Sequence, residues 1–188
     1  MKHLKLTILV TAGLLASAAA AQAQEKKMEM PKPGPEVKKL DYFVGNWTSE
    51  GEMKPGPWGA GGKMTGSDKC SWMEGGWFVV CHSEGSSPMG KMNGLGVMGY
   101  DAAKKNYTWN GFNNMGENEH ADGNVAGKTW TYTNESMMGG KPMKGRYTIT
   151  ETSATSYDFK MEGSEDGKTW NTLMEGKVTK KGAAEKKM

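Results

Sequence analysis

The chain has 188 residues, with 24 basic and 21 acidic side chains and a net charge of +3. Arg146 is the single arginine. Nucleic-acid sites depend on arginine forks and clustered positive charge, so we do not expect nucleic-acid binding. Glycine (27 residues) and methionine (16 residues) are frequent, and aliphatic residues are few. Seven tryptophans, six tyrosines and four phenylalanines must therefore supply most of the buried surface.

The first residues have the composition of a secretory signal peptide. Residues 1–5 are basic, residues 6–20 are apolar and small, and Ala21-Gln22-Ala23 fits a cleavage site. The apolar stretch is too short for a membrane-spanning helix, and no later stretch reaches membrane length. We therefore expect residues 1–23 to be removed and the protein to be exported, either to the periplasm or out of the cell.

Beyond the signal peptide, the sequence predicts one domain between two disordered ends. Residues 24–34 are rich in lysine and proline without an apolar period, which is typical of a disordered tether. Residues 182–188 have the same character and predict a disordered tail. The stretch between them, residues 35–181, has the length of a single domain.

A short helix is predicted over residues 35–44, because proline suits a first helical turn and apolar residues recur at helical spacing. These apolar residues are Val37, Leu40, Phe43 and Val44. An irregular lead-in is the alternative interpretation. Gly45 and Trp47 follow directly, and from there the pattern changes to the alternation of strands. We interpret Trp47 as the residue that plugs the floor of a closed β-barrel.

Short strands and glycine-rich turns fill the rest of the domain. In residues 129–133 aromatic side chains alternate with threonines, which is the period of a half-buried strand. Similar alternation predicts strands at residues 46–53, 64–73, 77–84, 94–100, 106–113, 117–122, 128–135, 144–151, 155–162 and 169–179. Because no helix separates them, they form an antiparallel meander, and closing the sheet hides its edges. The predicted fold is all-β, an antiparallel up-and-down barrel of about ten strands with a short N-terminal helix.

The two cysteines of the chain flank a predicted hairpin. Gly75-Gly76 reads as a two-residue turn, because glycine tolerates positive φ at both positions. This register places Cys70 opposite Cys81, and facing Cβ atoms lie about 4.5–5.5 Å apart. With slight closure, a disulfide fits. We expect the disulfide, with a pair of buried thiols as the alternative.

Three stretches resemble one known family. They are Val44-Gly-Asn-Trp-Thr-Ser-Glu-Gly-Glu-Met53, Lys69-Cys-Ser-Trp-Met-Glu-Gly-Gly-Trp-Phe78 and Gly94-Leu-Gly-Val-Met-Gly-Tyr-Asp101. Gly-x-Trp after a short helix is similar to the calycin superfamily of lipocalins and fatty-acid-binding proteins. The longer stretches resemble the domain-of-unknown-function 1579 family of bacterial exported proteins, DUF1579. The resemblance covers most of the chain and implies a lipocalin-like barrel, while the activity of the family is not established.

Haem-binding relatives of this barrel use a histidine late in the chain. Here no histidine follows His120, so that role is not carried over. Other catalytic signals are missing as well: there is no G-x-S-x-G motif, and neither His82 nor His120 belongs to an H-E-x-x-H motif. The glycines of residues 59–62 precede no helix, so they form no phosphate loop. We expect a protein that is not an enzyme.

Aromatic residues on the predicted inward faces would line or fill the barrel. The alternation within the strands selects Trp109, Trp130, Tyr132, Tyr147, Phe159 and Trp170. Large rings could leave a cavity that holds one small molecule, as in eight-stranded lipocalins, or they could close the interior completely. The sequence leaves this choice open, and it leaves the oligomeric state open too.

Methionine gathers at one end of the predicted barrel. In an up-and-down barrel every second loop opens at the same end, which here groups the loops at 54–63, 85–93, 114–116, 136–143 and 163–168. Met53 and Met64 flank the first loop. The expected rim residues are Trp58, Met89, Met92, Met115, Met137, Met138 and Met143. His82 would end the third strand at this rim, and His120 would lie a few residues from it.

Three interpretations of these methionines remain. They fill gaps in a core that is poor in leucine, in which case the barrel is only a structural or interaction module. Alternatively, they form a soft mouth for a small apolar or amphipathic ligand, because methionine surfaces adapt to varied ligands. In the third interpretation they bind Cu(I) or Ag(I), through Met137 and Met138 with His82 or His120, because soft ligands select soft metals. We expect non-catalytic binding of a small apolar ligand, without a cofactor.

Overall fold

The computed structural model describes residues 31–56, 59–138 and 140–182. The expected signal peptide, most of the expected tether, the last six residues and the rim residue Trp58 lie outside these ranges. So does the side chain of Met138, although its backbone belongs to a strand. Within the described ranges, no helix is long and apolar enough to cross a membrane.

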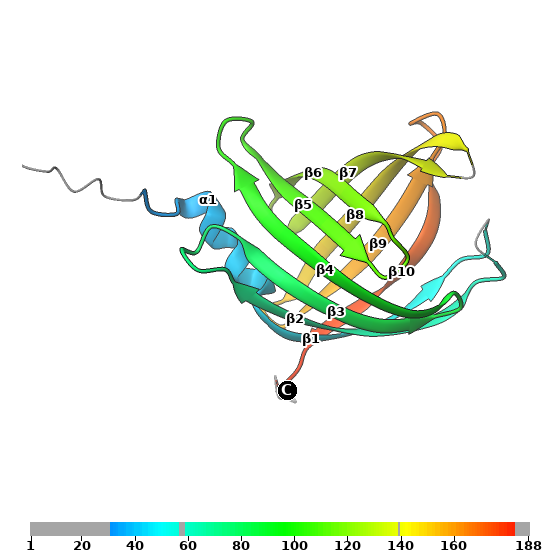
Figure 1. Cartoon of the computed structure of the whole chain (residues 1–188), viewed down its shortest axis with the longest axis horizontal. Helices are drawn as coiled ribbons and strands as arrows, with labels where there is room; N and C mark the ends of the chain where they lie inside the picture. Colours follow the sequence, from blue (N-terminus) through cyan, green and yellow to red (C-terminus); the bar gives the residue numbers. More distant parts are fainter. Residues whose placement is uncertain (1–30, 57–58, 139, 183–188) are drawn as a thin grey trace, which may run out of the picture. The chain divides into compact units, whose positions relative to one another are not determined.

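The described residues form a closed, antiparallel, up-and-down β-barrel (Figure 1). Each strand pairs with the next, and the first pairs with the last, which confirms the predicted fold. The strands are β1 (Gly45–Met53), β2 (Gly62–Trp72), β3 (Val79–Ser87), β4 (Gly90–Asp101), β5 (Asn106–Asn113), β6 (Asn118–Ala126), β7 (Thr129–Met138), β8 (Lys141–Ser153), β9 (Ser156–Ser164) and β10 (Asn171–Lys180). Closure pairs every strand on both sides, so no strand edge is left exposed.

A short helical segment closes one end of the barrel, which we call the floor. It consists of α1 (Pro35–Lys38) and the 3-10 helix η1 (Lys39–Phe43), close to the predicted helix. Leu40 is fully buried, and the ring of Phe43 packs edge-on against Trp130 with centroids 5.0 Å apart. The segment therefore plugs the floor with apolar side chains, and the opposite end, the mouth, carries the loop between β1 and β2.

Trp47 lies beneath this plug. Its side chain is only 2% exposed, and its Nε1 donates a hydrogen bond of 2.7 Å to the carbonyl oxygen of Phe43. The Nζ of Lys180, at the end of β10, lies 4.9 Å from the ring centroid. Gly45, two residues before Trp47, has a φ of +134°. A Cβ at Gly45 would lie 2.6 Å from the Cε of Lys180. Only glycine can make this transition from helix to strand without strain.

The hairpin between β2 and β3 has the predicted register. Cys70 pairs with Cys81 inside the barrel wall, and the two are joined by a disulfide. The turn itself is longer than predicted, because β2 ends at Trp72 and β3 begins at Val79. Gly75 and Gly76 both have positive φ at its tip, as the sequence required.

The connection between β3 and β4 corrects another boundary. The predicted loop at 85–93 is mostly strand, and only Pro88 and Met89 connect β3 with β4. Gly85 faces Gly66 across the β2–β3 pair, and a Cβ on Gly85 would lie 2.8 Å from the carbonyl oxygen of Thr65. Glycine therefore permits a close backbone approach here rather than a turn.

The interior has large side chains along one wall and small ones along the half of the other wall nearer the mouth. On β7 to β9 the inward residues Trp130, Tyr132, Ile149 and Phe159 are buried. On β2 to β5 the inward positions include Gly66, Gly85, Gly94, Gly96 and Gly111. Rings cover some glycines: Trp109 packs on Gly96 and Gly111, and Phe159 packs on glycines of β1 and β10. Large side chains thus fill the side formed by β7 to β9, and space remains along the half of β2 to β5 nearer the mouth, because Met98, Tyr107 and Trp109 occupy inward positions nearer the floor.

Candidate ligand-binding site

A cavity of about 160 Å³ lies along the wall of small side chains. We call it the lumen cavity, and its inward-facing residues include Ser49, Met64, Asp68, Ser83, Met92 and Asn113, with glycines between them. Asp68 and Ser83 are the lining residues of β2 and β3 that lie nearest the floor, whereas Met64 and Met92 lie nearer the mouth. The cavity therefore has a polar base and thioether walls.

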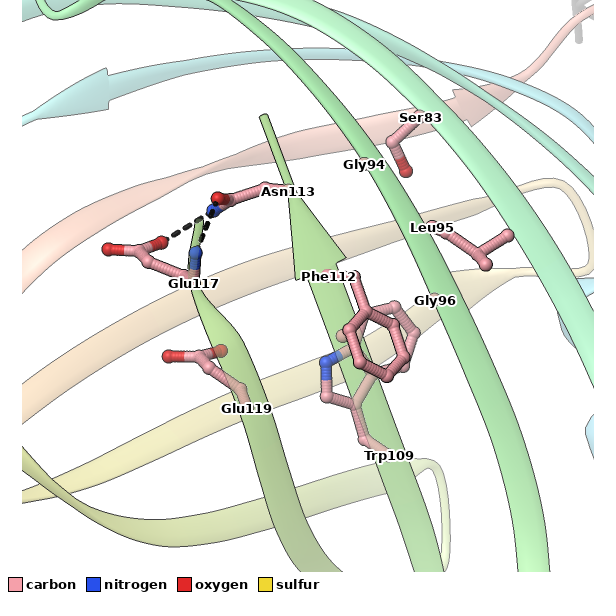
Figure 2. Close-up of a pocket in the computed structure, with 10 residues that line it drawn as sticks. Ser83, Gly94, Leu95, Gly96, Trp109, Phe112, Asn113, Glu117 and Glu119 are labelled. Atoms are coloured by element: carbon pink, nitrogen blue, oxygen red, sulfur yellow. Dashed lines mark hydrogen bonds between the residues drawn. The ribbon is translucent and has the colours of Figure 1, made fainter. Parts of the chain in front are cut away.

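A second hollow of about 160 Å³ adjoins the first, since both are bordered by Ser83, Gly94 and Asn113 (Figure 2). Trp109 of β5 and Glu119 of β6 also border it. An apolar cavity of about 150 Å³ holds a benzene-sized molecule. The two hollows together therefore provide room for a small organic ligand.

Asp68 is the main polar group at the base. It lies between Trp47 of β1 and Ser83 of β3 in the ladder, and the hydroxyl of Ser83 donates a hydrogen bond to its carboxylate. Burial raises the pKa of Asp68, and the hydrogen bond from Ser83 acts in the opposite direction without cancelling the effect. An ionised Asp68 is thus held in an environment that disfavours its charge.

Tyrosines face Asp68 from the opposite wall. Burial raises the pKa of Tyr147 above its ordinary value, and the nearby Asp68 and Tyr132 raise it further. Tyr132 is 3% exposed, and its buried hydroxyl has no hydrogen-bond partner among the described residues. A buried hydroxyl without a partner is unfavourable. A ligand atom in the lumen that forms a hydrogen bond with this hydroxyl would remove the unfavourable contribution.

Glu119 provides a second inward carboxyl nearer the mouth. Burial raises its pKa, and the neighbouring Glu117 adds to the effect. Glu117 in turn accepts a hydrogen bond from the side-chain amide of Asn113 (Figure 2). The lumen thus carries carboxyl groups at its base and near its mouth.

Five of the six expected interior aromatics lie inside the barrel. Trp109, Trp130, Tyr132, Tyr147 and Phe159 all occupy inward positions of their strands. Of these, Trp109 borders the second hollow, and the nearby Asp68 and Tyr132 raise the pKa of Tyr147. Trp130 belongs to the floor, where its Nε1 donates a hydrogen bond of 2.7 Å to Glu151.

The expectation that Trp170 lies in the interior is wrong. Trp170 precedes β10, and its ring lies under the guanidinium of Arg146, which is 4.1 Å from the ring centroid. Arg146 also pairs with Glu162 at 2.8 Å, across the outer face of β8 and β9. The register of β10 shifts between Thr172 and Met174, so the alternation inferred from the sequence does not extend to Trp170.

The expected methionine rim divides into two groups. Met92 and Met143 point into the barrel, as do Met53 and Met64. Met89 and Met115 are exposed in turns, and Met137 is 68% exposed on β7. The expected rim therefore accounts for only some of these methionines. The others lie in strands and point inward, because β3, β4, β7 and β8 extend farther than their predicted ends.

Of the residues of the alternative metal site, the structure describes the side chains of Met137, His82 and His120, and His82 does not lie at the rim. His82 lies in the middle of β3 on its outer face, not at the rim, because β3 continues to Ser87. His120 is exposed on β6, with its Nδ1 2.9 Å from the amide oxygen of Asn110. No group of three or more His, Cys, Asp or Glu residues that could hold a metal occurs in the part of the chain that the structure describes.

The sequence interpretation missed Asp68, Ser83 and Glu119, and it did not assign the inward methionines of β9 and β10 to the site. Asp68 shares its inward face with Met64, Gly66 and Cys70 on β2. A carboxyl at this inward position could have indicated the site from the sequence, because charged residues are almost never fully buried unless they are paired.

The fold and the lumen together define a small, closed, up-and-down β-barrel with one plugged end and a partly hollow interior. This is an up-and-down β-barrel architecture, which resembles that of the eight-stranded lipocalins but has ten strands. Residues 32–180 match the model of the family described as "Protein of unknown function (DUF1579)", and the chain belongs to that family. A search of curated proteins found no match.

Among the solved structures with a similar fold, the first supports the barrel assignment. The crystal structure of Rv2717c from M. tuberculosis aligns with a TM-score of 0.56 at 12% identity, over 78% of this chain and 98% of that one. A de novo designed fluorescence-activating β-barrel aligns with a TM-score of 0.43 at 13% identity, over 75% and 95%. A redesigned barrel, mFAP0, bound to DFHBI aligns with a TM-score of 0.42 at 11% identity, over 74% and 99%. At these identities the likeness concerns the fold alone.

Proposed function

We propose that this protein binds a small apolar or amphipathic molecule in the lumen cavity without catalysing its conversion. The observation that carries the proposal is a hollow barrel with the partly buried carboxyl of Asp68 at the base of its cavity, together with the buried, inward-facing hydroxyl of Tyr132, which has no hydrogen-bond partner among the described residues. Buried polar groups that lack partners destabilise a fold. Such groups are therefore more often kept for binding than for packing.

The barrel leaves a ligand one route of entry. The floor is closed by Leu40, Phe43 and Trp47, so a ligand enters from the mouth. Met64 and Met92 border the cavity on that side. Methionine side chains are flexible and polarizable, so they adapt to an apolar body while the polar end reaches Asp68. The disulfide suits an exported protein, since such bonds persist in oxidising compartments.

A matched pair of serine variants tests this proposal. Ser49 lines the lumen cavity from β1, whereas Ser71 is exposed on the outer face of β2. Ser49→Leu fills the cavity, and Ser71→Leu makes the same chemical change outside it. We expect the wild type to bind the neutral fluorescent probe N-phenyl-1-naphthylamine saturably. Ser71→Leu should retain the affinity, and Ser49→Leu should lose at least about tenfold, because filling the pocket excludes the ligand.

Two outcomes contradict ligand binding in the lumen. One is a wild-type protein that shows no saturable binding of the probe. The other is a Ser49→Leu variant that remains folded and binds as tightly as Ser71→Leu. Circular dichroism and thermal unfolding of both variants establish that they are folded before the titration.

A second candidate function, binding of Cu(I) or Ag(I), is favoured by one arrangement inside the barrel. Met53 of β1 faces Met174 of β10, which in turn faces Met161 of β9. Facing residues on adjacent strands have Cβ atoms about 4.5–5.5 Å apart, so the three thioethers lie within reach of one another. Thioethers select soft metals. This interior set differs from the rim set that the sequence suggested.

A further inference from the structure

The charge of the lumen indicates which ligands it accepts. At the inward positions of the described strands, the basic residues are Lys180 at the floor and Lys141 at the mouth. Lys180 lies against Trp47, and the exposed Lys141 lies 3.9 Å from Glu165. Between these two levels the inward charged groups are the carboxyls of Asp68 and Glu119. The interior is therefore acidic and has no internal counter-ion.

Neither carboxyl has a cationic partner among the described residues. The hydrogen bond of Asp68 comes from the neutral hydroxyl of Ser83. The charged residue that acts on Glu119 is another carboxylate, Glu117. Both carboxyls are partly buried, a charge that is partly removed from water without a partner is unfavourable, and an opposite charge at short range relieves this. A ligand that carries a positive charge would supply this missing partner.

A second, independent observation is the hydroxyl of Tyr132. The side chain is 3% exposed and points inward, and its oxygen is buried without a hydrogen-bond partner. Tyr132 faces Tyr147 across β7 and β8, and Asp68 raises the pKa of Tyr147, so the unpartnered hydroxyl and the carboxyl face the same barrel interior. A hydroxyl oxygen accepts a hydrogen bond from an ammonium N–H, as a carboxylate does.

The aromatic and thioether walls suit an organic cation. Trp109 borders the same hollow as Glu119 (Figure 2). Tryptophan is the strongest aromatic partner of a cation, and the attraction increases when the site is desolvated. Met64 and Met92 offer apolar, polarizable contacts to the rest of the molecule.

We propose that the lumen selects a small organic cation, an alkyl or aryl amine or a quaternary ammonium compound, with its charge held by Asp68 at the base of one hollow, while Glu119 and Trp109 border the adjoining hollow. This inference rests on the proposed function and adds the sign of the ligand's charge. It follows that a fatty acid of the same length is disfavoured, because its carboxylate would lie beside Asp68 and Glu119.

Calorimetric titration at pH 7 with octylamine, octanol and octanoate tests the inference, since these probes differ in charge and little in their apolar chain. We expect octylamine to bind at least about tenfold more tightly than octanoate, with octanol between them. Asp68→Asn should remove about tenfold or more of the octylamine affinity and leave that of octanol within about twofold. The matched variant Asp158→Asn, exposed on the outer face of β9, should change neither.

The outcomes separate this inference from the function on which it rests. If none of the three probes binds, ligand binding in the lumen fails and the charge inference fails with it. If octanol binds but octanoate binds as tightly as octylamine, only the charge inference is overturned. An Asp68→Asn variant with unchanged octylamine affinity overturns it as well, because the proposed counter-ion is then not used.

Discussion

Asp68 and Ser83 face each other across β2 and β3 inside the barrel, and the Ser83 hydroxyl donates a hydrogen bond to the Asp68 carboxylate. The serine is a neutral partner, so the charge of Asp68 remains uncompensated. Burial raises the pKa of Asp68 despite this bond. A residue that disfavours the ligand-free fold at neutral pH and lines a cavity is a candidate for function rather than for packing.

Replacement of Asp68 should stabilise the protein at neutral pH. The folded-state pKa is raised above the ordinary value of 3.8. The relative stability that this shift confers is present at low pH and is lost as the pH rises through the folded-state pKa. Asp68→Asn mimics the protonated form, so it should raise the melting temperature at pH 7. The difference from wild type should shrink as the pH falls below the ordinary pKa of aspartate.

Scanning calorimetry of Asp68→Asn and of the exposed control Asp158→Asn at several pH values measures this difference. A lower melting temperature for Asp68→Asn at pH 7 would contradict the assignment of an uncompensated buried carboxyl. Equal effects of the two variants would also contradict it.

Removal of the Trp47 side chain should strongly destabilise the fold. Trp47 is buried beneath the helical plug and holds it through a hydrogen bond to Phe43. Trp47→Ala should reduce the free energy of unfolding by about 3–5 kcal/mol, as for other large core deletions. Guanidinium unfolding measures it, with Phe112→Ala as an exposed control on the outer face of β5. An unchanged unfolding midpoint would show that Trp47 does not hold the floor.

The Cys70–Cys81 disulfide should stabilise the β2–β3 hairpin modestly. The bond joins residues separated by 11 positions, and a short loop of this kind contributes about 2–3 kcal/mol at most. Peptide mapping by mass spectrometry without reductant should recover the linked pair. Two freely alkylated thiols in the native protein would contradict the bond.

Several features of the fold follow from local sequence patterns. Alternation in residues such as Trp130 and Tyr132 predicted the strands, and the Gly75-Gly76 turn predicted which residues face each other in the hairpin. Both are local signals, because they depend on residues close in sequence. The helix before Trp47 was predicted for the same reason.

The site depended on information that local patterns do not contain. Gly85 reads as a turn residue, but it lies within β3 because it faces Gly66 at close range. Trp170 lies outside the interior, contrary to the prediction, because the register of β10 shifts close to it. A short stretch of sequence does not specify how distant strands pair. It also does not specify which part of the barrel wall collects the small inward residues. The cavity and its acidic base therefore emerged only from the three-dimensional structure.

The interior methionines distinguish a soft metal from an organic ligand. Met174→Leu preserves volume and apolarity but removes the central sulfur of the Met53, Met174 and Met161 set. If the set binds Cu(I), the variant should lose metal in competition with a chelator. Binding of N-phenyl-1-naphthylamine should be unchanged in either case. Equal Cu(I) retention by wild type and variant would argue against a thioether site.

Occupation of the barrel interior by a ligand can be observed directly through the methionine methyl groups. Met64 and Met92 line the lumen cavity, whereas Met89, Met115 and Met137 are exposed. In a titration of methyl-labelled protein with N-phenyl-1-naphthylamine followed by NMR, the Met64 and Met92 signals should shift saturably while the exposed methionine signals stay in place. Shifts confined to the exposed methionines, or no saturable shift at all, would contradict ligand binding in the lumen.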